Sequence, residues 1–330
     1  MSNLELSIAV GDYDRNRALF DGRVRIDGVD PVFMKLSPEE IFFRAFRTQD
    51  FDICELSFSS YTVGVANGTA HYTGVPAFLS RSFRHSSIYI RNDKGIERPE
   101  DLAGRRIGIA EYQLTANVWA RALLEDDHGV KPSDISWVRG GMDTPDRPEK
   151  IKLDLPADVS VEAAPEGRSL NDLLVAGEID GFIGPRSPAC FIEGNPNISW
   201  LYPDLVGAAK DYFARTGIFP VMHLLGVRKS LADRHPWLPA ALYKAFSQSK
   251  EHAIAQMDDT AASAVSLPFL AERLADARAS MGRDFWSYGV KANRNGLENF
   301  LDHHHRQGLS KRRVSVEELF HTSTLEQFAI

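Results

Sequence analysis

Residues 98–110 read RPEDLAGRRIGIA, and this stretch decides the class of fold. Pro99, Glu100 and Asp101 predict a one-turn helix that ends at Gly104, and the residues after it predict a strand over 106–110. A helix with apolar residues on its buried face then opens after residue 111 and closes at Gly129, and a strand follows over 135–138. Strand, helix and strand in this order form a βαβ unit. The sequence therefore predicts an α/β fold with a parallel sheet in this region.

The segments on either side continue the alternation of strands and helices. Apolar periodicity predicts strands over 4–10, 51–56, 177–183 and 219–227, the last returning to the first lobe. Helices are expected over 38–47, with Ser37 as its N-cap, and over 237–257. Val24, Ile26, Val32 and Phe33 suggest a strand hairpin that turns at residues 27–28.

Length and charge bound the class of protein. A chain of 330 residues exceeds what one hydrophobic core usually supports, so two lobes are expected. The net charge is −7, and no basic stripe is present of the kind that nucleic-acid binding needs. The short basic run over 311–313 is expected to be solvated. The composition therefore argues against a nucleic-acid partner.

Cysteine usage and hydropathy exclude further classes. The two cysteines, Cys54 and Cys190, are far apart in sequence and lack zinc spacing, so we expect buried free thiols rather than a disulfide. No window of 18 apolar residues predicts a membrane span. The first ten residues lack the basic and apolar regions of a signal peptide, so a cytoplasmic location is expected.

Several polar residues lie at the ends of predicted strands, where α/β sheets bind ligands. Arg81, Arg84 and His85 fall within six residues that connect two strands, which favours either a carboxylate clamp or a solvated loop. Arg81 and Arg84 cannot both face inward if this segment is extended. Arg186 follows the strand over 177–183 and is a third candidate for binding a carboxylate. Serines at the junction before the helix at 57–61 could bind an anion or only cap that helix.

The chain as a whole resembles the type 2 periplasmic-binding-protein fold and, more closely, the 4,5-dihydroxyphthalate decarboxylase family. The matching pieces are residues 13–15, 51–61, 75–85, 98–110, 108–113, 180–188 and 219–223. The resemblance implies two α/β lobes with mixed sheets and a ligand cleft between them. The first lobe would comprise residues 1–94 and 222–330, with the C-terminal helices, and the second residues 95–221. It also implies a cytoplasmic enzyme on a binding-protein scaffold.

This resemblance implies removal of one carboxylate of 4,5-dihydroxyphthalate as carbon dioxide, by protonation of the ring carbon. His85 and His223 are then the leading acid or base candidates, because histidine titrates near neutral pH. Glu111 could accept a catechol hydroxyl, or could simply favour the start of a helix. The expected carboxylate ligands and ring contacts are Arg81, Arg84, Arg186, Ser57, Ser59, Thr115 and Tyr13, whereas core packing is the expected role of Tyr61.

No cofactor is expected, because protonation of the ring needs none, although a divalent ion that bridges the catechol oxygens stays open. The run His303, His304 and His305 is interpreted as a solvated helix face, since consecutive helical residues converge poorly on one metal ion. The expected partner is a small aromatic carboxylate. The helical tail after residue 290 could pack on its own lobe or on a second copy of the chain.

Two other functions are compatible with the same scaffold. A non-catalytic solute-binding protein for a small aromatic or organic anion would bind ligand without turnover. A biosynthetic enzyme of the thiamine-pyrimidine type ranks last, because no cysteine-rich iron motif is present.

Overall fold

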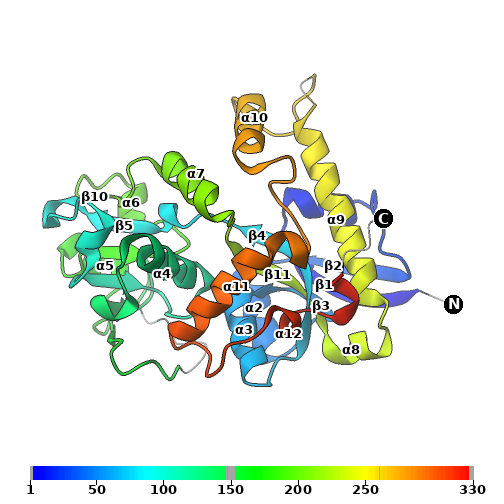
Figure 1. The fold of residues 1–330 in the computed structure, drawn as a ribbon, viewed down its shortest axis with the longest axis horizontal. Helices are drawn as coiled ribbons and strands as arrows, with labels where there is room; N and C mark the ends of the chain where they lie inside the picture. Colours follow the sequence, from blue (N-terminus) through cyan, green and yellow to red (C-terminus); the bar gives the residue numbers. More distant parts are fainter. Residues whose placement is uncertain (1–2, 146, 148–152, 260, 327–330) are drawn as a thin grey trace. The chain divides into compact units, whose positions relative to one another are not determined.

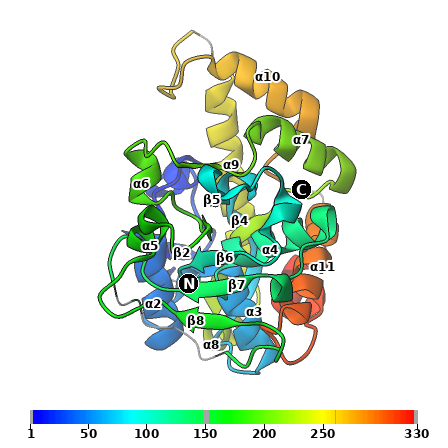
Figure 2. The same ribbon diagram turned by 90° about the vertical axis from the view of Figure 1, so that its left-hand side faces the viewer.

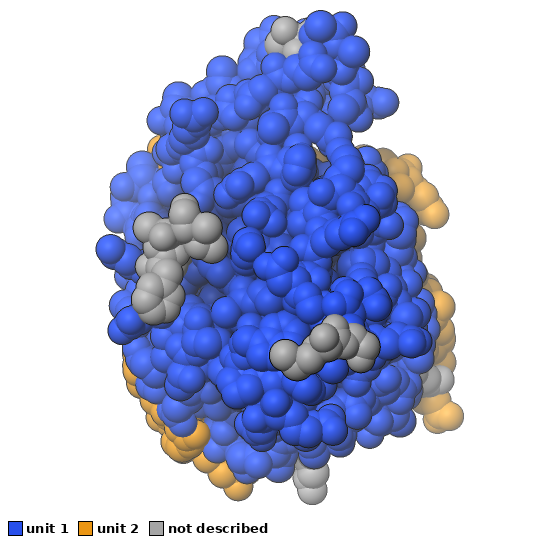
Figure 3. Space-filling model, turned by 90° about the vertical axis from the view of Figure 1, so that its right-hand side faces the viewer, with its two compact units in different colours: residues 1–81, 213–298, 314–330 blue, residues 82–212, 299–313 orange. Residues whose placement is uncertain are grey.

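The computed structural model describes residues 3–145, 147, 153–259 and 261–326. The chain forms two compact units, coloured separately in Figure 3. Unit 1 comprises residues 1–81, 213–298 and 314–330, and unit 2 comprises residues 82–212 and 299–313. Among the described residues, no helix combines the length and the apolar character that crossing a membrane requires.

Unit 1 contains a mixed five-stranded sheet in the order β2-β1-β3-β11-β4. β1 pairs in parallel with β2 and β3, whereas β11 runs antiparallel between β3 and β4. The strand expected over 219–227 is therefore confirmed as β11, which completes the sheet begun by the first 81 residues. The strands are β1 (Leu4–Val10), β2 (Val29–Lys35), β3 (Ile53–Ser57), β4 (Tyr72–Arg81) and β11 (Val221–Arg228).

Helices flank this sheet (Figure 1). The helix expected over 38–47 is confirmed as α2, and the Ser37 hydroxyl accepts a hydrogen bond from the Glu40 backbone N–H at 3.4 Å. α2 and α3 pack on β3, and α9 packs on β4. The helices of unit 1 are α1 (Arg17–Phe20), α2 (Pro38–Arg47), α3 (Phe58–Ala66), α8 (Lys229–Arg234), α9 (Leu238–Met257), α10 (Leu270–Met281), the first part of α11 (Val290–Arg306) and α12 (Val316–Leu319).

Unit 2 contains a mixed six-stranded sheet in the order β10-β5-β9-β6-β7-β8. β6 and β7 pair in parallel, with α4 between them in the chain, so the predicted βαβ unit is confirmed. Figure 2 shows β6, β7 and β8 side by side. The strands are β5 (Ile88–Arg91), β6 (Arg106–Ile109), β7 (Ser136–Arg139), β8 (Val161–Ala163), β9 (Gly181–Ile183) and β10 (Ile198–Trp200).

The helices of unit 2 enclose its sheet. α5 contacts β6 and β9, and α6 contacts β10. The first ten residues of α4 are all buried, and the second part of α11 packs on this helix: the Phe300 ring lies against Trp119 at a centroid distance of 5.3 Å. The helices are α4 (Thr115–His128), α5 (Leu170–Ala176), α6 (Ala189–Ile192) and most of α7 (Leu205–Thr216).

The boundaries of the two units differ from those of the expected lobes. Residues 82–94 belong to unit 2, because β5 pairs with β9 in its sheet. Residues 299–313 also belong to unit 2, where Gln307 accepts a hydrogen bond from the buried Arg121 Nε at 2.8 Å. The sequence does not indicate that residues 299–313 belong to unit 2, because residues 121 and 307 are far apart in sequence and come into contact only in the folded protein.

The predicted hairpin over residues 24–33 is wrong. Val24 and Ile26 are buried but form no strand, and β2 pairs in parallel with β1. The chain leaves β1 through α1 and turns into β2 at Gly28, whose φ of 73° suits glycine. The apolar pattern was correct about burial but could not distinguish a hairpin from a crossover.

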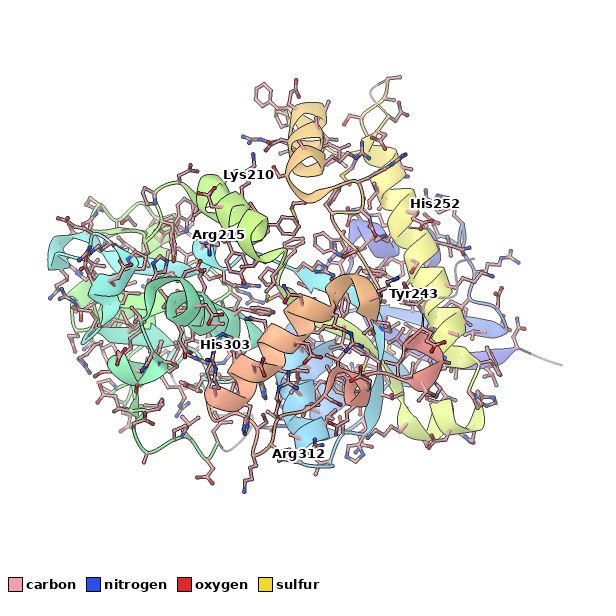
Figure 4. All side chains as sticks on the ribbon, in the orientation of Figure 1. Lys210, Arg215, Tyr243, His252, His303 and Arg312 are labelled. Carbon is pink, nitrogen blue, oxygen red and sulfur yellow. The ribbon has the colours of Figure 1, made fainter. Side chains whose placement is uncertain are left out.

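The predicted solvated face at the histidine run is wrong for His303 and His304, whereas His305 is exposed as expected. His303, labelled in Figure 4, and His304 are 1% and 0% exposed. The Asp126 carboxylate lies 2.8 Å from His303 Nε2, and the Ser310 hydroxyl lies 3.1 Å from His304 Nδ1. The first contact joins the second part of α11 to the end of α4, and the second joins α11 to the segment that follows it. The basic run over 311–313 is exposed, as expected, and Cys54 and Cys190 are buried free thiols, also as expected.

Candidate active site

A fully buried carboxylate lies in the middle of the unit 1 sheet. Glu55 belongs to β3, and its side chain has no exposed surface. Three donors surround it: the Gly11 backbone N–H at 3.0 Å, the Tyr13 hydroxyl at 2.8 Å and His223 Nδ1 at 2.6 Å. Burying a charge without partners is costly, so these three hydrogen bonds compensate for the burial of the ionised Glu55 carboxylate.

His223 is the partner of Glu55 that remains accessible. It lies on β11, opposite Ser57 of β3, and 19% of its side chain is exposed. An ionised carboxylate can only accept, so Nδ1 carries the hydrogen and Nε2 is left for chemistry. Among the described residues, no group forms a hydrogen bond with Nε2. Phe42 packs edge-to-face on the imidazole at a centroid distance of 4.8 Å, which further fixes the ring.

The surroundings of Glu55 favour the ionised form of its carboxylate. Burial by itself would raise the pKa of Glu55, but the hydrogen bond and charge of His223, the Gly11 N–H and the Tyr13 hydroxyl together lower that pKa below its usual value. Glu55 therefore stays ionised at neutral pH. An ionised carboxylate on Nδ1 orients the imidazole, which is the arrangement of a general acid or base.

Tyr13 is held in place by a cation between two aromatic rings. The Arg15 guanidinium carbon lies 4.1 Å from the centroid of the Tyr13 ring and 4.6 Å from that of Trp286. Its Nε also donates to the Leu79 carbonyl at 2.7 Å. Burial, followed by the neighbouring Glu55 charge, raises the pKa of Tyr13. Tyr13 therefore keeps its proton and serves as a donor to Glu55.

The sequence indicated Tyr13 and His223 but missed Glu55 and Arg15. Glu55 carried one signal: a charged residue between Cys54 and Leu56 in an apolar strand should be buried, and a buried carboxylate requires partners. Arg15 carried no such signal. Its role depends on Trp286, which is distant in sequence and reaches Arg15 only in the folded unit.

Glu111 lies in a second buried cluster, in unit 2. Arg147 Nε donates to Glu111 Oε1 at 2.8 Å, and the Gln113 amide donates to Oε2 at 2.7 Å. The carboxylate has no exposed surface. Both of its oxygens are already engaged by these neighbours, so the mechanism proposed below gives Glu111 no role.

The other unit 2 candidates occupy different environments. His85 is 3% exposed and packs among aromatic rings, with Tyr202 at 4.9 Å and Tyr212 at 5.7 Å between centroids. Arg186 is exposed in the turn after β9, and Thr115 is the buried first residue of α4. The last unit 2 candidate, Arg84, is buried, and its Nη1 donates to the Ser87 hydroxyl.

The remaining unit 1 candidates are buried near the ends of β3 and β4. Arg81 donates to the backbone carbonyls of Phe219 and Ser287 and to the Asn293 side chain, so it ties three segments of unit 1 together. Ser57 is the buried residue before α3, and Ser59 is buried within its first turn. Tyr61 is 2% exposed and packs in the core, as expected, with its hydroxyl donating to the Leu319 carbonyl at 2.5 Å.

Among the described residues, no group of three or more histidine, cysteine, aspartate or glutamate side chains is arranged to hold a metal ion.

Known proteins similar to this chain include two curated enzymes. The 4,5-dihydroxyphthalate decarboxylase of Comamonas testosteroni is 58% identical over 330 residues, which is 100% of both chains. The enzyme of the same name from Pseudomonas putida is 62% identical over 213 residues, covering 64% of this chain and 83% of the relative. This chain belongs to the 4,5-dihydroxyphthalate decarboxylase family. A family model described as NMT1/THI5 like also matches residues 59–154.

Solved structures place this decarboxylase family member on a known fold. The periplasmic aliphatic sulphonate binding protein of Escherichia coli superposes with a TM-score of 0.52 at 12% identity, covering 100% of this chain and 96% of that one. A periplasmic sulfonate-binding protein of Methylobacillus flagellatus gives a TM-score of 0.55 at 13% identity, covering 97% and 92%. The fold is therefore type 2 periplasmic-binding-protein-like, as expected.

Tyr13→Phe tests the support of the buried carboxylate. Phenylalanine keeps the ring beside Arg15 but removes the donor to Glu55, so we expect kcat to fall several-fold, with a stability loss of about 1 kcal/mol. Steady-state kinetics and urea unfolding measure both. Tyr243→Phe on α9 is a matched control, since it removes a hydroxyl from a helix that carries no site residue. Equal kinetics for Tyr13→Phe and the wild type would mean that the hydroxyl does not support the reaction.

Proposed function

We propose that this protein decarboxylates 4,5-dihydroxyphthalate to protocatechuate and carbon dioxide, and that His223 delivers the proton to the ring. The 58% identity over the whole chain to a curated 4,5-dihydroxyphthalate decarboxylase supports the reaction. The buried Glu55 with His223 on its Oε1 at 2.6 Å is the single geometric observation that supports the mechanism.

The chemistry sets what the site has to supply. A carboxylate leaves an aromatic ring with difficulty, because the resulting aryl anion is poorly stabilised. In this substrate each carboxylate is para to a hydroxyl, which pushes electron density to the ring carbon that bears the carboxylate. Protonation of that carbon breaks the aromaticity. The carbon–carbon bond then breaks, carbon dioxide leaves, and its bonding electrons restore the aromatic ring.

His223 fits the donor of that proton. With Nδ1–H bound to Glu55, a protonated imidazole presents its second proton on Nε2. The Glu55 charge stabilises the imidazolium before transfer, and Tyr13 and Gly11 keep Glu55 from taking a proton itself. One proton is consumed in each turnover, and the partly exposed imidazole can regain it from solvent.

The site must also avoid stabilising the substrate too well. Ionic contacts to the departing carboxylate would lower the free energy of the ground state more than that of the transition state, because its negative charge disappears as carbon dioxide forms. Contacts to the carboxylate that stays carry no such penalty. We therefore expect strong binding of one carboxylate and weak binding of the other.

Product analysis tests this proposal. The purified protein is incubated with 4,5-dihydroxyphthalate, and protocatechuate is measured by chromatography and carbon dioxide by gas analysis. In D₂O the product should carry one deuterium on the vacated ring carbon, because the incoming proton derives from solvent. Ligand-induced stabilisation without product would favour the solute-binding alternative.

A further inference from the structure

Four arginines of the described chain are buried, and three of them have two or more hydrogen-bond acceptors, although one nitrogen of Arg81 and one of Arg121 are enclosed without a partner. Arg81 has the three acceptors described above. Arg91 pairs with Asp93 at 2.6 Å and donates to two backbone carbonyls of α5. Arg121 donates to Gln307 and to the Tyr112 carbonyl, and its guanidinium carbon lies 3.7 Å from the centroid of the Tyr112 ring.

Arg84, the fourth, has one acceptor. It is 8% exposed, and Nη1 donates to the Ser87 hydroxyl at 3.1 Å. A guanidinium carries five N–H donors, so the remaining four have no acceptor among the described residues. Its Nε is enclosed without a partner, and no carboxylate of the described residues forms an ion pair with it. Burial lowers the pKa of Arg84 to about 10, so the group is still a cation at neutral pH.

The neighbours of Arg84 are hydroxyl groups rather than acids. Ser87 closes the one-turn helix η2 (His85–Ser87), and Tyr89 of β5 is close enough to act on the Arg84 charge. The Tyr89 hydroxyl in turn lies 2.8 Å from the hydroxyl of Ser187, in the turn after β9. A cation beside groups that both donate and accept is the composition of a site for a small anion.

From these missing acceptors around the Arg84 guanidinium we infer that Arg84 is the carboxylate-binding residue of unit 2. Ser87, Tyr89 and Ser187 complete the site. The ligand class is a carboxylate on an aromatic ring, and this choice of ligand rests on the proposed function. A bidentate carboxylate would supply two of the missing acceptors and the missing negative charge at once. Arg84 would thus hold a carboxylate of an aromatic acid.

The physical reason is the cost of an uncompensated buried charge. A structural arginine is stabilising because its partners are present in the folded protein, as at Arg91. Arg84 lacks such a partner, so in the ligand-free protein it should be destabilising. Residues that destabilise the folded protein without ligand and stabilise it with ligand are typical of binding sites, where the requirements of function oppose those of stability.

Arg84→Met tests the sign of this contribution. Methionine keeps a long side chain but removes the charge and the donors. We expect the ligand-free variant to unfold at the same temperature as the wild type or a higher one, and to lose the thermal stabilisation that benzoate gives the wild type. Benzoate affinity, measured by calorimetry, should fall on the order of tenfold to hundredfold. Catechol, which has no carboxylate, serves as the probe whose binding should not change.

Two further variants complete the experiment. Arg98→Gln, at an exposed arginine of the same unit, controls for net charge and should bind benzoate normally. Ser187→Ala keeps Arg84 and should weaken benzoate binding several-fold. The inference would be overturned if Arg84→Met failed to fold or unfolded at a lower temperature than the wild type. It would also be overturned if that variant bound benzoate as the wild type does, or if the wild type did not bind benzoate. Benzoate binding that depends on Arg84 in a protein without turnover would refute the decarboxylase proposal and leave this site intact.

Discussion

His223→Asn should abolish most of the decarboxylase activity, with kcat lower by about 10²- to 10⁴-fold, the range for loss of a general acid. Asparagine is chosen because its amide can donate to Glu55 from near the position of Nδ1, while no group replaces Nε2. The buried carboxylate thus keeps its third donor, and the fold should be preserved. Steady-state kinetics give kcat and KM, and circular dichroism verifies folding.

A matched control separates this effect from the loss of any histidine. His71→Asn changes an exposed histidine next to β4 in the same unit and should leave kcat unchanged. Activity of His223→Asn within a few-fold of the wild type would exclude His223 as the proton donor. The D₂O experiment adds a second readout, since residual product from the variant should form slowly but still carry deuterium.

Glu55→Gln should cost both activity and stability. The amide has the shape of the carboxylate but no charge, and its NH₂ group faces one of the three donors that Glu55 accepts. Leaving a buried donor unpaired and removing the charged partner of His223 should lower the free energy of unfolding by about 3 kcal/mol. We expect kcat to fall by about a hundredfold or more, because the imidazolium loses the charge that stabilises it.

The pH dependence of this stability difference has a definite sign. The pKa of Glu55 is lower in the folded protein than in the unfolded chain, so the carboxylate stabilises the fold above the unfolded pKa of about 4.3. This contribution is lost as the pH falls through the lowered folded value. Urea midpoints of the wild type and Glu55→Gln should therefore differ most near neutral pH and converge in acid. A constant difference across that range would contradict an ionised Glu55.

Local patterns predicted the parts of the fold that depend on neighbouring residues. The capped helix over 38–47 and the strand, helix and strand from residue 106 to 139 were predicted because caps and apolar periodicity act within a few residues. The hairpin over 24–33 was predicted wrongly, since alternation does not say which strand is the partner. The burial of His303 and His304 was not predicted. The Asp126 carboxylate that forms a hydrogen bond with His303 lies 177 residues away in sequence.

By itself, the sequence determined the fold class, the family and two members of the candidate site, Tyr13 and His223. Tertiary structure alone decided that Glu55 connects them, because pairing β3 with β11 brings residues 168 positions apart to a distance of 2.6 Å. It alone also separated Arg84, which has one acceptor, from the three buried arginines that have two or more. Such distinctions depend on which groups surround a buried charge in the folded protein, and a linear pattern does not contain that information.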